Sequence, residues 1–274
     1  MHSRTSRLLL YVFIVGILAW TVVPILWMVL ASFKPDPYIY TDQPKWFFPP
    51  TLEHYSGMLS EDDSLLSHLK NSLLAAGIST FTSLLFGIAA GYGLARGRFA
   101  NNKHLSFWII STRMAPIAAV IIPLYLLFSQ LHLLYTLTGL VIAYMTFNLP
   151  FAIWLMSAFF KDLPPSLEEA ALVDGANRWQ IFWHVALPLT TPGIVTTAIL
   201  CFVFAWNDYA FSATFFSGPD GKTIPVAAAQ LLTQSGIDWG KLMAIGTLTV
   251  LPMIGFGLLV RRWLVRGLTL GAVK

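Results

Sequence analysis

Six long apolar stretches constrain the fold of this chain more than any other feature of its sequence. They cover residues 8–31, 71–95, 105–129, 137–160, 192–215 and 242–263. Each is close to the length of about 20 residues that a helix needs to cross the hydrocarbon core of a bilayer. Only 11% of the 274 residues are charged, whereas soluble domains carry about a quarter. We therefore predict an all-α membrane protein, with one transmembrane domain over residues 1–274 and six transmembrane helices.

The segments between these stretches differ in their content of basic residues. One alternating set consists of the N-terminus, residues 96–104, residues 161–191 and the C-terminal end, and it holds eleven Lys or Arg against five in the opposite set. Short loops rich in Lys and Arg stay in the cytoplasm. We therefore predict that both termini, the loop 161–191 and the tail 264–274 are cytoplasmic. The outer segment 32–70 is predicted to be either a compact cap over the outer mouth or an irregular linker.

The loop 161–191 contains the signals of a short helix. The prolines before Ser166 keep the chain extended, because a residue that precedes proline avoids the helical region. Ser166 can cap the helix, and Glu169 three residues later completes a capping box. Glu168 and Glu169 also place negative charge at the positive end of the helix dipole. The pattern predicts that a helix begins at Ser166.

Small residues define the face and the end of this helix. Ala170 and Ala171 favour a helix and have almost no side chain, so another surface can approach closely. Gly175, between Asp174 and Ala176, can adopt the left-handed conformation that ends a helix. We predict a helix over residues 166–176 that fits a groove on another protein. The alternative is a surface helix that only orders the loop.

This loop resembles the EAA loop of permease subunits of binding-protein-dependent ABC importers. The family pattern is E-A-A, two residues, often D, then G, nine residues, I, one residue, and L-P. The residues that match are Glu169-Ala170-Ala171, Asp174-Gly175 and Leu187-Pro188, with Val185 where isoleucine is usual. The chain is most similar to carbohydrate permeases of the maltose-transporter type, in particular to the six-span partner subunit. Residues 112–116, 206–209 and 265–274 also resemble that family.

The resemblance implies a type I ABC importer permease fold in a bacterial or archaeal plasma membrane. It implies that the helix docks on an ATPase through Ser166, Glu168, Glu169, Ala170, Ala171, Asp174, Gly175 and Ala176, and that the tail reaches the ATPase dimer. The implied partners are a second homologous permease, two ATPase subunits, an extracytoplasmic solute-binding protein and membrane lipid, without nucleic acid. ATP and Mg would bind the ATPase and not this chain. The implied solute is a di- or oligosaccharide, a polyol or an amino sugar.

Apart from Arg261 and Arg262 at the end of the sixth stretch, two charged residues lie within the predicted spans. At a rise of 1.5 Å per residue, Arg113 is about 12 Å into the third span and Asp208 about 24 Å into the fifth, so we expect them at different depths. Charges in the bilayer face protein or a water-filled path. One interpretation places them on the solute pathway, because carboxylates and amides bind hydroxyl groups and aromatic rings pack against sugars. The other is a buried polar network. The candidates for the solute pathway are Trp206, Asn207, Asp208, Tyr209, Asn148 and Arg113.

The sequence contains no catalytic, nucleotide-binding or metal-binding motif. Residues 218–223 hint at a phosphate loop, but that motif requires glycine where this chain has Phe216, and we expect no helix to follow. The single cysteine, Cys201, is expected to be a small buried apolar residue. The chain is therefore predicted not to be an enzyme. An ion-coupled secondary transporter is the alternative, although such proteins usually have inverted repeats, and none is evident.

Overall fold

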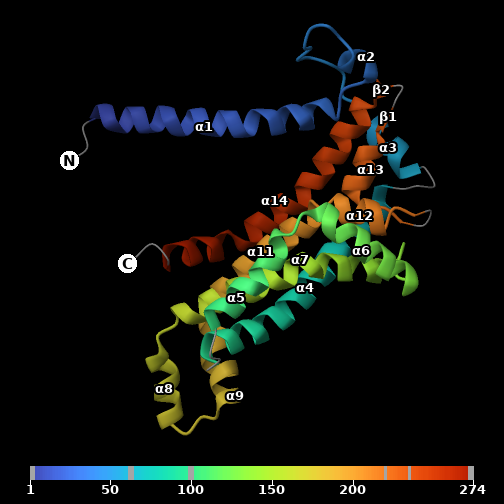
Figure 1. Cartoon of the computed structure of the whole chain (residues 1–274). Helices are drawn as coiled ribbons and strands as arrows, with labels where there is room; N and C mark the ends of the chain where they lie inside the picture. Colours follow the sequence, from blue (N-terminus) through green and yellow to red (C-terminus); the bar gives the residue numbers. More distant parts are fainter. Residues whose placement is uncertain (1–3, 61–64, 98–101, 219–220, 234–235, 271–274) are drawn as a thin grey trace. The chain divides into compact units, whose positions relative to one another are not determined.

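The computed structural model describes residues 4–60, 65–97, 102–218, 221–233 and 236–270, and these residues are almost entirely helical (Figure 1). The α-helices are α1 (Arg4–Ala31), α2 (Asp36–Ile39), α3 (Glu53–Ser60), α4 (Leu65–Arg96), α5 (Asn102–Ser111), α6 (Ile117–Gln130), α7 (Leu137–Asp162), α8 (Pro165–Val173), α9 (Arg178–Ile181), α10 (Leu187–Leu189), α11 (Thr191–Trp206), α12 (Ala210–Phe215), α13 (Ile224–Gln230) and α14 (Trp239–Leu270). A 3-10 helix, η1, covers Thr112–Met114, and a π-helix, η2, covers Phe182–Ala186. The strands β1 (Leu232–Thr233) and β2 (Gly236–Ile237) form an antiparallel pair. The all-α prediction is confirmed.

The helices of the described residues are long and apolar enough for four membrane spans, or for up to six if each of two bent helix pairs forms one span. The four are Leu8–Ala31, Leu65–Arg96, Leu137–Asp162 and Trp239–Leu258, and the bent pairs are His104–Met114 with Ile117–Gln130 and Arg178–Leu189 with Thr191–Trp206. All six predicted stretches overlap these helices. In the predicted tail, residues 264–270 continue α14 as a helix, and residues 271–274 lie outside the described residues.

Two of the predicted spans contain sharp breaks. In the third, the helices bend by 86° at Ala115 and Pro116, and not at Pro123, which lies inside α6. Ala115 is extended, with ψ 135°, because the ring of the following proline disfavours the helical region. The fifth stretch, 192–215, is also not one helix, since α11 ends at Trp206 and α12 begins at Ala210.

The contacts of the chain define two compact units, and each is described by itself. The first unit comprises the described residues of 1–66 and 227–252. Within it, the segment after α1 is folded by hydrogen bonds between distant residues. The Tyr55 hydroxyl donates to Ser32 Oγ at 2.7 Å, and the Tyr40 hydroxyl donates to the Ile237 carbonyl at 2.9 Å. These bonds agree with a compact segment, while its position over an outer mouth stays a prediction.

Lys34 is a buried cation in this first unit. Its side chain is covered by aromatic rings, and Nζ lies 4.1 Å from the ring centroid of Trp27 and 5.2 Å from that of Phe48. Burial lowers the pKa of the Lys34 ammonium group below its ordinary value, because desolvation disfavours the charged form. The carbonyl of the same residue is 2.7 Å from His54 Nε2. Lys34 therefore joins α1 to the segment that follows it.

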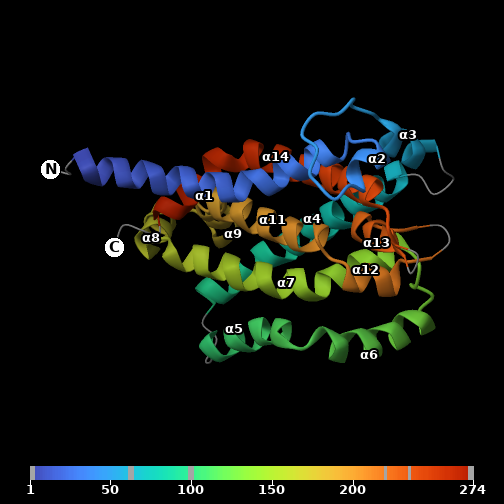
Figure 2. The same cartoon turned by 90° about the horizontal axis from the view of Figure 1, so that it is seen from above.

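The second unit comprises the described residues of 67–226 and 253–270. Helices α4, α7 and α11 run side by side in it (Figures 1 and 2). Gly87 and Gly91 allow α4 to approach α7 closely, since a Cβ atom at these positions would lie 2.7 Å from Ala152 Cβ and 2.8 Å from Met156 Cβ. This is the close helix contact expected of a GxxxG pair.

Candidate docking helix and solute cavity

The start of α8 differs from the predicted capping box. Pro165 occupies the beginning of the helix and Pro164 is the N-cap residue, without a side-chain capping bond. The predicted Ser166 cap is therefore wrong, because proline at the first helical position has a suitable φ and needs no capping of its missing N–H. A capping box is found at α9 instead, where Gln180 N donates to Asn177 Oδ1 at 2.9 Å and Asn177 N donates to Gln180 Oε1 at 2.8 Å.

The end of α8 is formed as predicted by Gly175, which has a φ of +86°. Ala176 N donates to the Ala171 carbonyl at 2.9 Å, and Gly175 N donates to the Leu172 carbonyl at 3.0 Å. This pair of bonds is the Schellman motif, in which a left-handed residue satisfies the last carbonyls of a helix. The helix itself ends at Val173, so residues 174–176 form its cap.

Most of the predicted docking residues lie on the surface of the chain. Those that are exposed are Ser166, Glu169, Ala170, Asp174 and Gly175, and those that are half-buried are Glu168, Ala171 and Ala176. Sequence reasoning missed the apolar part of this surface. Val173 is 88% exposed, Leu172 is 49% exposed and Leu167 is 44% exposed. Exposed apolar side chains on a short helix are typical of a protein contact, and their sequence signal was their position beside the alanine face.

Glu168 does not point outward with the other docking residues. Arg96 Nε donates to Glu168 Oε1 at 2.7 Å, and the Tyr92 hydroxyl donates to Glu168 Oε2 at 3.1 Å. A cavity of about 440 Å³ lies beside these groups, lined also by Glu169 and Arg178. The first turn of α8 is therefore held against the last turns of α4.

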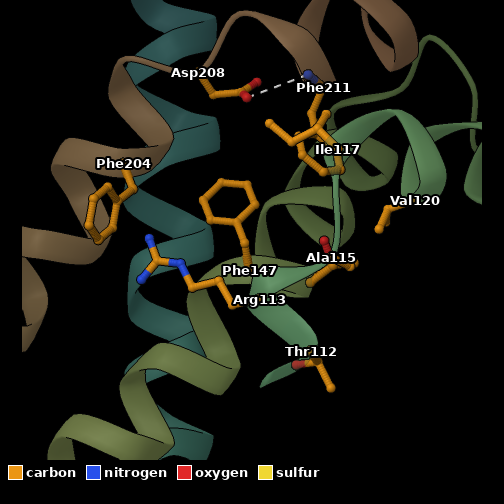
Figure 3. A pocket seen from close by; sticks show the side chains of 10 residues that line it. Thr112, Arg113, Ala115, Ile117, Val120, Phe147, Phe204, Asp208 and Phe211 are labelled. Carbon is orange, nitrogen blue, oxygen red and sulfur yellow. Dashed lines mark hydrogen bonds between the residues drawn. The ribbon is translucent and has the colours of Figure 1, made fainter. Parts of the chain in front are cut away.

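A second cavity, of about 260 Å³, lies between the broken helices of this unit (Figure 3). It contains both Arg113 and Asp208. Its polar lining is Thr112, Arg113, Thr146 and Asp208, and its aromatic lining is Phe147, Phe204 and Phe211. Arg113 and Asp208 line one cavity with Phe147 between them, and the difference in their depths in the membrane stays a prediction. They form no ion pair within the described part of the chain.

Arg113 is held by aromatic rings. Its guanidinium carbon lies 4.1 Å from the ring centroid of Phe204 and 4.5 Å from that of Phe151. Cation–π contacts of this kind stabilise a partly desolvated cation. Among the described residues the guanidinium has no hydrogen-bond acceptor, so its N–H donors are available to the cavity.

Asp208 has a structural role that the sequence did not indicate. Its carboxylate accepts hydrogen bonds from Ser212 N at 3.0 Å and from Phe211 N at 3.4 Å. These N–H groups belong to the first turn of α12, where no backbone carbonyl can reach them. Asp208 therefore fixes the start of α12 and also contributes to the wall of the cavity (Figure 3).

The other candidates for the solute pathway are not among the lining residues of this cavity. Trp206 is 1% exposed and stacks on Phe202 at a centroid distance of 5.6 Å. Asn148 is also buried and donates to the Cys201 carbonyl at 3.1 Å, which joins α7 to α11. Asn207 and Tyr209 are exposed at the break before α12. The free thiol of Cys201 is buried, as expected.

The loop 218–223 is followed by a helix, because α13 begins at Ile224. The prediction that no helix starts there was wrong. The glycine that a phosphate loop requires is still replaced by Phe216. Among the described residues no group of three or more His, Cys, Asp or Glu side chains could hold a metal ion.

Membrane-length helices, some of them broken beside a cavity, define this chain as a helical membrane protein. Residues 83–270 match the family described as "Binding-protein-dependent transport system inner membrane component". The chain belongs to this family and is an inner-membrane permease subunit of an ABC importer, whose ATPase is a separate subunit. Subunits of this family bind no cofactor themselves.

Curated relatives match the chain over nearly its full length. A probable ABC transporter permease protein, y4oR, from Sinorhizobium fredii is 34% identical over 99% of this chain and 98% of its own. The trehalose transport system permease protein SugB of Mycobacterium tuberculosis is 34% identical over 94% of each chain. The trehalose/maltose permease protein MalG of Thermococcus litoralis is 31% identical over 92% of this chain and 91% of its own.

Solved structures share the fold. A bacterial ABC transporter involved in the import of the acidic polysaccharide alginate matches with a TM-score of 0.75 and 25% identity, over 96% of this chain and 99% of that one. The MetNI methionine ABC transporter matches with a TM-score of 0.61 and 18% identity, over 77% of this chain and 96% of that one. The type I importer permease fold predicted from the sequence is confirmed.

Proposed function

We propose that this subunit forms half of the translocation pathway for a sugar or sugar-like solute, and that α8 is its docking helix for the ATPase. The observation that carries the docking role is the exposed face of α8, which ends at a glycine cap and presents Val173 and Leu172. An ordered helix loses little conformational entropy on binding, so a preformed α8 suits transmission of force.

The second cavity supports a sugar-like solute. Hydroxyl groups from Thr112 and Thr146 and charged groups from Arg113 and Asp208 can bind sugar hydroxyls, while Phe147 offers an apolar ring face. The names of the relatives agree with this class, since they include trehalose, maltose and diacetylchitobiose permeases. We place the solute pathway through this cavity. Asn148, Asn207, Trp206 and Tyr209 then act in supporting or entry positions.

In the proposed complex, the single domain of residues 1–274 crosses the membrane six times with both termini in the cytoplasm, as the basic loops predict. The family and the alginate transporter structures support an importer that includes an ATPase and a periplasmic binding protein. The finer assembly proposed has a second homologous permease and two ATPase subunits, surrounded by lipid and without nucleic acid. Closure of the ATPase dimer would move α8 and rock the spans, and the tail 264–274 would reach the dimer interface.

Reconstitution tests this function. Proteoliposomes that contain the chain and its partner permease are compared with and without the ATPase, using radiolabelled trehalose, maltose and diacetylchitobiose with the external binding protein. We expect uptake only when both ATPase and ATP are present. Uptake driven by a proton or sodium gradient without the ATPase would contradict the proposal. ATP-dependent uptake of a labelled amino acid, which an excess of none of the three sugars inhibits, would contradict the solute class alone.

A further inference from the structure

One acidic residue of the docking helix is turned away from the docking surface. Glu168 and Glu169 are neighbours in the first turns of α8, but successive helical residues point about 100° apart. Glu169 is exposed, whereas the side chain of Glu168 is only 13% exposed and that of its partner Arg96 only 18%. Both glutamates border the cavity beside α4, but only Glu168 is bound to α4 through its carboxylate.

Both oxygens of Glu168 are bound to α4. Oε1 accepts from Arg96 Nε at 2.7 Å, and Oε2 accepts from the Tyr92 hydroxyl at 3.1 Å. Arg96 Nη2 also donates to the Leu163 carbonyl at 3.1 Å, in the short segment between α7 and α8. We call Tyr92, Arg96 and Glu168 the α4–α8 tie. Charge-assisted hydrogen bonds of this kind are stronger than neutral ones, and partial burial reduces their screening by salt.

The α4–α8 tie restricts the movement of α8 relative to α4. The chain enters α8 through Leu163 and Pro164, and α8 also packs against α9 and η2, but none of these contacts reaches the end of α4. The contact at Glu168 lies in the first turn of α8 and adds a direct attachment to α4. A movement of α8 can therefore act directly on α4 through Glu168 as well as through α9 and η2.

Tyr92 connects the tie to the core of the unit. Its ring lies 5.2 Å from the centroid of Phe160, which is fully buried, and 4.9 Å from that of Phe182. Tyr92 and Arg96 are four residues apart and so lie on one face of α4. The tie is therefore continuous with packed aromatic side chains of α7 and η2.

A contiguous path leads from the tie to the solute cavity. Helix α4 contacts the backbone of α7 through Gly91, where an added Cβ would lie 2.9 Å from Ser157 N. Helix α7 carries Thr146 and Phe147, which line the cavity. Since packed helices shift as rigid elements and not by continuous deformation, a displacement of α8 would reach the cavity wall through α4 and α7.

We infer that Tyr92, Arg96 and Glu168 are positioning residues that couple the ATPase docking helix to the transmembrane pathway, separately from the residues that contact the ATPase. The inference rests on the proposed function. It predicts that breaking the tie leaves ATPase binding intact but lowers the amount of solute transported per ATP hydrolysed. Breaking the docking surface would instead weaken ATPase binding.

The test compares Glu168→Ala with Glu169→Ala in the reconstituted complex. For Glu168→Ala we expect normal co-purification of the ATPase and a fall of about tenfold in solute imported per ATP, a typical coupling between sites. For Glu169→Ala we expect weaker co-purification. Asp162→Ala removes an exposed carboxylate at the end of α7 and is the matched control, with both readouts unchanged.

Two further variants keep the inference testable if Glu168→Ala does not assemble. Tyr92→Phe removes one hydrogen bond but keeps the ring in its aromatic cluster, so a smaller fall in coupling is expected. In Arg96→Cys/Glu168→Cys, a short bifunctional thiol reagent should restore the coupling that the double substitution abolishes. The single-cysteine variants control for reaction at Cys201, which is buried.

Three outcomes would overturn the inference while leaving the proposed function in place: unchanged transport per ATP in all tie variants, loss of ATPase binding in Glu168→Ala equal to that in Glu169→Ala, or no recovery on cross-linking. ATPase-independent transport by the unmodified complex would instead refute the proposed function itself.

Discussion

Substitutions at Gly175 distinguish the effect of backbone conformation at the end of α8 from the effect of side-chain size. Gly175 has a φ of +86°, and a Cβ atom there would meet nothing within 4 Å. Gly175→Ala therefore introduces backbone strain without a clash inside the chain. A left-handed conformation costs a non-glycine residue about 1 kcal/mol, which corresponds to about fivefold in an equilibrium constant.

The strain affects ATPase binding only if the bound helix needs the left-handed cap. In that case the free chain can relax by fraying the end of α8, and binding must restore the cap. We therefore expect Gly175→Ala to raise the Kd for the purified ATPase up to about fivefold, as measured by microscale thermophoresis with the permease complex in nanodiscs. Gly175→Asn is the matched control, because asparagine tolerates the left-handed region, and its Kd should be near that of the unmodified complex.

A bulky side chain at position 175 would add a steric clash with the ATPase to the backbone strain. Gly175→Trp should weaken binding more than Gly175→Ala, and it should also lower uptake in proteoliposomes, since Gly175 is exposed beside the docking face. The reasoning is refuted if Ala and Asn at this position give the same Kd, or if Gly175→Trp assembles and transports normally.

Three other substitutions test the cavity and the helix contacts. Arg113→Gln removes a charged donor that lines the cavity, whose hydrogen bond to a solute hydroxyl would be worth about 1.5–3 kcal/mol. It should lower uptake at least about tenfold while ATPase co-purification stays normal; a normal uptake rate would remove Arg113 from the pathway. Gly91→Ala should lower the midpoint of thermal unfolding in detergent, because its Cβ would overlap the backbone of α7 at a cost of about 1–3 kcal/mol. The paired Gly93→Ala, with open space around its Cβ, should leave the midpoint unchanged or raise it, and equal midpoints would contradict the contact. Asn148→Leu removes the hydrogen bond from α7 to the Cys201 carbonyl and should cost about 0.5–1.5 kcal/mol of stability; an unchanged midpoint would show that the bond does not stabilise the fold.

The local features of the docking helix were largely predictable from the sequence. The glycine stop depends on a few consecutive residues, and a left-handed cap at Gly175 is what the structure has. The error at Ser166 has a local cause, since Pro165 directly before it can start the helix without a side-chain cap. The capping box formed by Asn177 and Gln180 obeys the same three-residue rule and could have been found in the sequence.

The breaks in the spans were only partly predictable. The prolines of these stretches are visible in the sequence, but they do not locate the 86° bend, because Pro123 remains inside a regular helix while Pro116 separates two helices. The choice depends on which freed backbone groups the surrounding helices can satisfy. Apolar composition identifies a stretch of membrane length and carries no information on that choice.

The sequence by itself determined the membrane class, the number of apolar stretches, the helix and glycine cap of the loop 161–191 and the family, because each depends on composition or on residues a few positions apart. Only the tertiary structure decided what Glu168 and Asp208 do. Glu168 binds Arg96, 72 residues away along the chain, and Asp208 stabilises the first turn of α12 beside a shared cavity. Glu168 and Arg96 come together only after the helices pack. Their roles therefore depend on distances in space, which the positions and charges of residues along the chain do not specify.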